Sequence, residues 1–109
     1  MRVEFLDVAE TELAEAVSHL NDQSEGLGFE FAAEVKQTIM RILHFPDAWT
    51  KISKRTRRCR TKRFPYGVIY QIRGDLILII AVMHLRRHPD TLLLDNICQV
   101  YGLVEASSV

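Results

Sequence analysis

The spacing of apolar residues changes once along this chain, at Pro46, and the change limits the folds it can adopt. Before Pro46, apolar residues recur every three or four positions, as they do on one face of an α-helix. They are Ala9, Leu13, Ala16, Val17 and Leu20, followed by Leu27, Phe31, Val35, Ile39, Ile42 and Leu43. The spacing predicts one helix that ends near the turn-rich stretch NDQSEG. A second helix is predicted from about Ser24 to about Phe45, where Pro46 stops it.

The start of the first helix is marked by Asp7, which is followed three residues later by Glu10. The pair matches a capping box in outline, with Asp in place of Ser or Thr. Ahead of it, VEFL (3–6) predicts a short strand. Two amphipathic helices joined by a short turn form a helical hairpin.

After Pro46 the period becomes that of strands. Residues 57–64 predict a charged strand, and YGVIYQIR (66–73) places Tyr66, Val68, Tyr70 and Ile72 on one face. Gly74-Asp75 predicts a tight hairpin turn that leads into LILIIAVMH (76–84). That last run is apolar on both faces, which predicts a central strand covered on both sides.

The order of elements predicts an α+β fold, β-α-α-β-β-β. We expect a mostly antiparallel four-stranded sheet with the helical hairpin on one face. Past these elements, Leu93, Ile97, Val100, Tyr101 and Val104 recur at spacings of three and four, which predicts a short C-terminal helix over about 91–104.

The length of 109 residues fits one domain, with a core over about 3–90 and a tail over 91–109. Cys59 and Cys98 are too few for a disulfide framework; they could form one disulfide, but two reduced thiols are expected. No apolar stretch typical of a signal peptide follows Met1, and the longest apolar run, 76–83, is too short to span a bilayer. We therefore expect a cytoplasmic protein with no membrane partner.

Charge is distributed unevenly. The chain is neutral overall, but residues 1–47 hold ten acids and three bases, whereas residues 48–109 hold four acids and eleven bases. Eight of the thirteen residues in KISKRTRRCRTKR (51–63) are Lys or Arg. Such asymmetry indicates an interaction with nucleic acid or another polyanion, or else two halves that balance each other within the fold.

Alternation along the strand at 57–64 separates its charges into two sets. Arg58, Arg60 and Lys62 share one face, Cys59, Thr61 and Arg63 share the other, and Arg57 at the start can point either way. The next strand adds Arg73, and the last strand exits through His84, Arg86, Arg87 and His88. Antiparallel pairing would join these groups in a concave cationic face that binds phosphates or acidic protein segments.

Neither a cofactor nor a metal site is predicted. His84 and His88 have a spacing that suits two ligands on a helix, but Pro89 and the preceding strand argue against a helix there. Neither a glycine-rich phosphate loop nor a nucleophile elbow is present. The acids of the first helix are spread around it, as on a solvated face.

The motifs FPYGVIYQI, DLILIIAVMH and RRHP, in this order, resemble the toxins of the RelE/ParE superfamily from type II toxin–antitoxin systems. The resemblance covers about residues 3–90 and is closer to ParE-like members around RFPYGVIYQI. It implies a toxin that binds and inhibits DNA gyrase and is neutralised by a cognate antitoxin. It also implies a complex of toxin and antitoxin, or a homodimer. An apolar groove left by the helical hairpin and the sheet is expected for the antitoxin.

The resemblance leaves two other functions open. RelE-like members cut messenger RNA on the ribosome, and the residues here for that chemistry would be Arg57, Arg60, His84 and Arg86. The third hypothesis is a non-toxic relative of these toxins that only binds an antitoxin. For binding of target or antitoxin, the candidates are Arg57, Arg58, Arg60, Lys62, Arg63, His84, Arg86 and Arg87. Past RRHP the chain reads DTLLLDN, where many family members carry Tyr-Trp and a further Arg, which weakens the nuclease reading.

Overall fold

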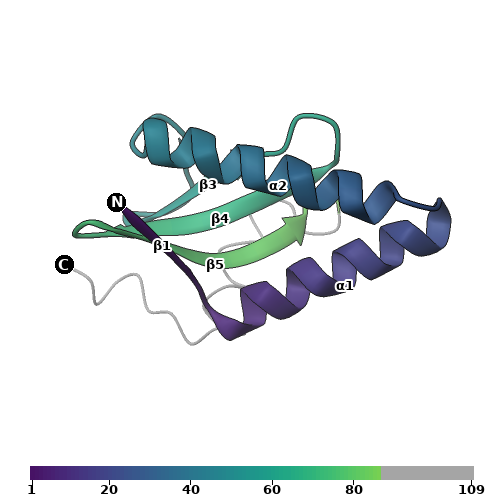
Figure 1. Cartoon of the computed structure of the whole chain (residues 1–109). Coiled ribbons are helices and arrows are strands. Elements are labelled where there is room, and N and C mark those ends of the chain that lie inside the picture. The colour runs from purple at the N-terminus through teal and green to yellow at the C-terminus, as the bar shows by residue number, and fades with distance from the viewer. Residues whose placement is uncertain (87–109) are drawn as a thin grey trace.

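The computed structural model describes residues 1–86, which form two helices and a five-stranded sheet (Figure 1). The elements are β1 (Arg2–Phe5), α1 (Asp7–Gln23), α2 (Leu27–His44), β2 (Thr50–Lys51), β3 (Thr56–Arg60), β4 (Tyr66–Arg73) and β5 (Leu76–His84). The α+β class and the helical hairpin after the first strand are confirmed. The predicted helix over 91–104 and the tail lie outside the described residues.

The sheet has the order β1-β5-β4-β3-β2, with β1 parallel to β5 and the other pairs antiparallel. It holds one strand more than the four expected. The additional strand, β2, has only two residues and pairs Thr50 with Arg58 and Lys51 with Arg57. Two residues are too few to show the alternation that reveals a strand in a sequence.

Both helices pack on the same face of the sheet, as Figure 1 shows. Their buried residues Ala16, Leu20, Phe31 and Val35 belong to one core with Val68, Tyr70, Ile77 and Ile79 of the strands. β4 alternates as predicted, with Tyr66, Val68 and Tyr70 in this core, whereas Ile69 joins a second cluster with Ile80, Ala81 and Met83. The central strand β5 is thus buried on both of its faces, as its sequence predicted.

The pairing of β4 with β5 contains a bulge between Ile69 and Tyr70. Ile69 pairs with Ala81 and Tyr70 pairs with Ile79, so Ile80 is an extra residue on β5. Val82, which follows the bulge, donates its backbone N–H to the carboxylate of Glu12 at 3.0 Å. Glu12 therefore ties α1 to the central strand, and this acid is not on a solvated face.

The ends of the elements differ from prediction for local reasons. Asp7 is the first helical residue of α1 rather than its cap, so the predicted capping box does not form. Asp7 and Glu10 lie in the first turn, where negative charge interacts favourably with the helix dipole. The second helix begins at Leu27, three residues later than expected, because Gly26 before it has a φ of 82°. β3 ends at Arg60, not at residue 64, since residues 61–65 turn the chain toward β4.

The two helices approach closely at Gly28. A Cβ at this position would overlap the backbone carbonyl of Val17. The backbone amide of Gly28 donates a hydrogen bond to Oδ1 of Asn21 at 2.7 Å. Gly28 is therefore the contact point that sets the spacing of α1 and α2.

Tyr70 ties the end of α2 to the sheet through its hydroxyl, which donates to the carbonyl of Pro46. Burial raises the pKa of Tyr70 well above its ordinary value, although the positive charge of Arg57 opposes the shift. An unfolded tyrosine loses its proton near pH 10, whereas the native one keeps it. The folded state then binds more protons than the unfolded state, so stability is lost as pH rises above about 10.

We therefore expect Tyr70→Phe to lower the free energy of unfolding at pH 8 by about 0.5–1.5 kcal/mol, through the lost hydrogen bond. The natural chain alone carries the Tyr70 proton linkage and should lose roughly 1 kcal/mol between pH 8 and pH 11, so the difference should largely disappear at pH 11. Urea unfolding at both pH values measures the two differences. Equal differences at pH 8 and pH 11 would contradict the shift.

Candidate functional site

A cationic hollow of about 530 Å³ lies where β3 ends, β4 begins and β5 ends. Among the described residues it is lined by Arg58, Arg60, Thr61, Lys62, Arg63, Phe64, Pro65, Leu85 and Arg86. This set joins the basic strand to the exit of the last strand, as the sequence predicted from antiparallel pairing. Five of the nine lining residues are Lys or Arg, so the hollow is suited to an anionic ligand.

Alternation along β3 directs Arg58 and Arg60 away from the helices, because Cys59 between them is buried in the core under α1 and α2. Arg58 crosses Gly67 of β4, its partner strand. A Cβ at Gly67 would stand 3.0 Å from Cγ of Arg58 and 3.0 Å from Cδ2 of Leu85. The absence of a side chain at Gly67 thus lets the stem of Arg58 lie close to the sheet.

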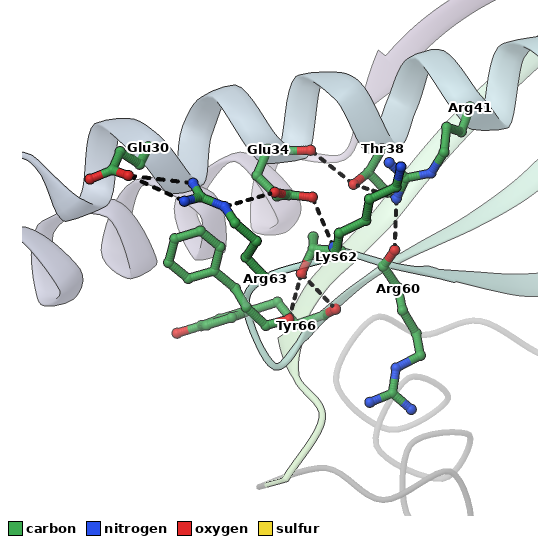
Figure 2. Close-up of polar contacts among 10 residues, drawn as sticks. Glu30, Glu34, Thr38, Arg41, Arg60, Lys62, Arg63 and Tyr66 are labelled. Carbon is green, nitrogen blue, oxygen red and sulfur yellow. Dashed lines mark hydrogen bonds and ion pairs between the residues drawn. The ribbon is translucent and has the colours of Figure 1, made fainter.

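The backbone of the hollow is fixed by α2 (Figure 2). The guanidinium of Arg41 donates to the carbonyl of Arg60 at 2.9 Å, and Oε2 of Glu34 accepts the amide N–H of Lys62 at 2.8 Å. Thr61 closes the turn by donating its hydroxyl to the carbonyl of Phe64 at 2.6 Å. In Figure 2 the side chain of Arg60 points away from α2. The helix therefore holds the backbone of residues 60–62 and leaves the Arg60 guanidinium on the other side.

Among residues 1–86, the predicted binding residues Arg57 and Arg63 form ion pairs with acidic residues. Arg63 lies 3.4 Å from Glu30 and 3.5 Å from Glu34, both on α2. Arg57 lies on the helix-covered face. It contacts the carboxylate of Asp47 at 3.7 Å and donates to the carbonyls of Asp47 and Trp49. Arg57 and Arg63 of the basic half are therefore balanced by acids of the first half of the chain. The side chains of Arg60, Lys62 and Arg86 are exposed to solvent.

His84 is not part of the hollow. Its ring stacks edge-on with Tyr66 at a centroid distance of 5.0 Å, and it lines a separate hollow with Glu12, Glu15 and His19 of α1. The backbone N–H of Arg86 donates to Nδ1 of His84 at 3.2 Å, which favours the tautomer with its proton on Nε2.

The predicted nuclease set is consequently divided. Arg57 and His84 lie on the face that the helices cover, while Arg60 and Arg86 line the cationic hollow. The expectation that Arg73 joins the same cationic face is wrong. Arg73 pairs with Leu76 at the opposite end of β4, and its guanidinium is bound to Oε1 of Gln71 at 2.6 Å. Arg87 and His88 lie outside the described residues.

Other chemistry finds little support in residues 1–86. Burial raises the pKa of the Cys59 thiol, although the positive charge of Arg41 opposes the shift, so this thiol remains protonated and is a poor nucleophile. Within the same residues, three or more His, Cys, Asp or Glu side chains do not gather as a metal site would require. Neither α1 nor α2 has the length and apolar character needed to cross a membrane.

A feature that the sequence reasoning missed is an apolar patch at the C-terminal end of α2. It surrounds a hollow of about 460 Å³ lined by Lys36, Gln37, Met40, Arg41, His44, Phe45 and Trp49. Phe45 is 63% exposed and Met40 is 42% exposed. The core fills most of the space between the helical hairpin and the sheet, and hollows of about 320 and 270 Å³ remain there beside His84. Phe45 directly after the helix, with Trp49 four residues later, is the signal that could have indicated this patch.

The sequence model of a known family matches residues 3–89, and its description is "ParE toxin of type II toxin-antitoxin system, parDE". The chain belongs to the ParE toxin family. The resemblance to ParE-like rather than RelE-like members is thereby confirmed. A comparison with curated proteins gives no match for this ParE-family protein.

A solved structure described as the "Chromosomal ParDE TA system from P. aeruginosa" has the same fold as this ParE-family protein, with a TM-score of 0.69. The match covers 77% of this chain and 95% of the other, at 12% sequence identity. Identity this low supports the shared fold, whereas membership of the toxin family rests on the match over residues 3–89.

Proposed function

We propose that this ParE-family protein acts in the cytoplasm as a toxin that binds and inhibits DNA gyrase, and that a cognate antitoxin neutralises it. The family match over residues 3–89 is the observation that carries the proposal. The mechanism is binding, with DNA left cut in the gyrase complex, rather than chemistry performed by this chain.

The division of the nuclease set supports binding over cleavage. Cutting RNA at the 2′-OH needs groups that remove one proton, deliver another and stabilise the phosphorane charge, and each acid or base contributes about two to four orders of magnitude. His84 is the only candidate acid or base in that set, and it faces α1 with Tyr66 rather than Arg60. A ribosome-dependent nuclease would require these groups to converge on one phosphate.

The apolar patch at the end of α2 supports an antitoxin partner. Exposed Met and aromatic residues are typical of protein interfaces, whose centres are apolar. Lys36, Arg41 and His44 surround Met40 and Phe45, so an amphipathic segment with acidic residues would fit both the shape and the charge. Segments that fold on binding can cover such surfaces.

Inducible expression tests the proposal. With the protein alone, we expect arrested growth with a DNA-damage response, and rescue when the neighbouring gene is co-expressed. In purified reactions the protein should inhibit supercoiling by gyrase and increase the amount of cut DNA, while messenger RNA on programmed ribosomes stays intact.

Two results would overturn it in different directions. Site-specific cleavage of ribosome-bound message that disappears in His84→Ala would favour the RelE-like nuclease. Normal growth at high expression, with a tagged neighbour that still co-purifies, would favour a relative that binds an antitoxin without toxicity.

A further inference from the structure

We propose that the cationic hollow is a binding site for the phosphodiester backbone of a nucleic acid. The expectation that this nucleic acid is DNA rests on the proposed function, since gyrase acts on DNA. The residues that would carry the contacts are Arg60, Lys62 and Arg86, with Arg58 on the wall beside them.

The distribution of ion pairs around the hollow is the first argument. Within residues 1–86, the carboxylates of α2 pair with Arg63, and Asp47 pairs with Arg57. Arg60, Lys62 and Arg86 are gathered at one hollow and exposed to water. Like charges held together raise the free energy of the folded state, and a bound polyanion relieves that cost. Cations in this arrangement are therefore placed for an external ligand rather than for the fold.

Rigidity of the backbone is the second argument. The carbonyl of Arg60 and the amide of Lys62 are both fixed to α2, by Arg41 at 2.9 Å and Glu34 at 2.8 Å. The strand below Arg58 approaches its stem at Gly67. Side chains that project from a fixed backbone lose less freedom when they bind, so more of the contact energy remains as affinity.

The composition of the hollow distinguishes a nucleic acid from a protein segment. Centres of protein–protein interfaces are depleted in charge and rich in apolar residues, whereas nucleic-acid interfaces are polar and strongly positive. The cationic hollow matches the second description, and the apolar patch at Met40, Phe45 and Trp49 matches the first. Arg guanidinium groups also suit phosphate oxygens, which they can bind in bidentate fashion.

Fluorescence anisotropy with the full chain tests the site, using a labelled DNA duplex and a labelled single-stranded RNA of equal length. Arg60→Gln together with Lys62→Gln should weaken binding to the preferred probe by about tenfold near 0.15 M salt. It should also lower the slope of log affinity against log salt by about two, since two phosphate contacts are lost. A preference for the duplex indicates DNA as the source, and a preference for the single strand indicates RNA.

A matched control is Lys51→Gln together with Lys54→Gln, which makes the same change in net charge within the same basic segment. Both lysines are exposed and neither is among the residues that line the hollow. We expect this control to keep its affinity within about twofold and most of its salt slope. Equal losses in the two double variants would reject a defined site. If the hollow binds polyglutamate but neither nucleic acid, the proposal is rejected and the hollow is assigned to an acidic protein segment.

Failure of this site and failure of the proposed function give different results. One outcome is that the Arg60→Gln/Lys62→Gln variant inhibits gyrase strongly and binds nucleic acid as well as the natural chain does. In that case the hollow is rejected as the nucleic-acid site, and the toxin function stands. If the natural chain leaves gyrase untouched but binds DNA through these two residues, the hollow stands and the gyrase target is rejected.

Discussion

Replacing Phe31 by alanine is expected to lower the free energy of unfolding by about 3–5 kcal/mol, the range for removing a buried aromatic side chain. Phe31 is 0% exposed at the centre of the core between the helices and the sheet. Its ring lies 5.2 Å from that of Phe64 and 4.6 Å from that of Tyr66, measured between centroids. The substitution removes the apolar burial and both ring contacts at once.

Chemical denaturation measures the loss, and Phe29→Ala is the matched control, because Phe29 is on the same helix and 70% exposed. The control should change stability by less than about 0.5 kcal/mol. Since Phe64 also lines the cationic hollow, Phe31→Ala should in addition disturb the turn at 61–65 that carries Lys62. Similar losses for Phe29→Ala and Phe31→Ala would show that the core is not centred where the structure places it.

Gly28→Ala is expected to destabilise the protein by about 1–3 kcal/mol, in the range for overpacking. On an exposed helix the same change would stabilise by about 1 kcal/mol, because alanine has the higher helix propensity. At Gly28 the new Cβ would overlap the backbone carbonyl of Val17, which cannot rotate away as a side chain can. The two helices must then move apart, which weakens the hydrogen bond from the Gly28 amide to Asn21.

The control for Gly28 is the reverse substitution at an exposed position of the same helix, Ala33→Gly. It should cost about 1 kcal/mol from propensity alone. Thermal unfolding of the two variants separates packing from propensity. A Gly28→Ala variant that is more stable than the natural chain would contradict the close helix contact.

Most of the fold could be predicted because the apolar periods are clear. The stripe from Leu27 to Leu43 and the alternation from Tyr66 to Ile72 each lie where the structure places a helix and a strand. The strand β2 could not be predicted, since two residues have no period, and its pairing depends on β3 alone. The missing capping box at Asp7 was a local error, because the chain enters α1 directly from a strand and Leu6 occupies the cap position.

The site could be predicted in outline, but its internal contacts could not. Antiparallel pairing was enough to bring Arg58, Arg60 and Arg86 to one end of the sheet. Which cations would pair with Glu30, Glu34 and Asp47 depends on how α2 lies against the turn at 61–65. That orientation is set by packing between segments far apart in the sequence, which a single sequence does not reveal.

The bulge at Ile80 in β5 keeps His84 on the side of the sheet that the helices cover. Side chains of a strand alternate with a period of two, so one inserted residue exchanges the faces of everything that follows it unless a bulge absorbs that residue. Ile77 and Ile79 point into the core before the bulge, and Val82 takes that orientation after it. A strand that kept Ile80 but alternated strictly would turn His84 toward the face of Arg58 and Arg60, whereas deletion of Ile80 would remove the bulge and leave Val82 and His84 on the core side. In evolutionary terms, the bulge absorbs one extra codon in β5 and keeps the imidazole on the side of the sheet away from these arginines.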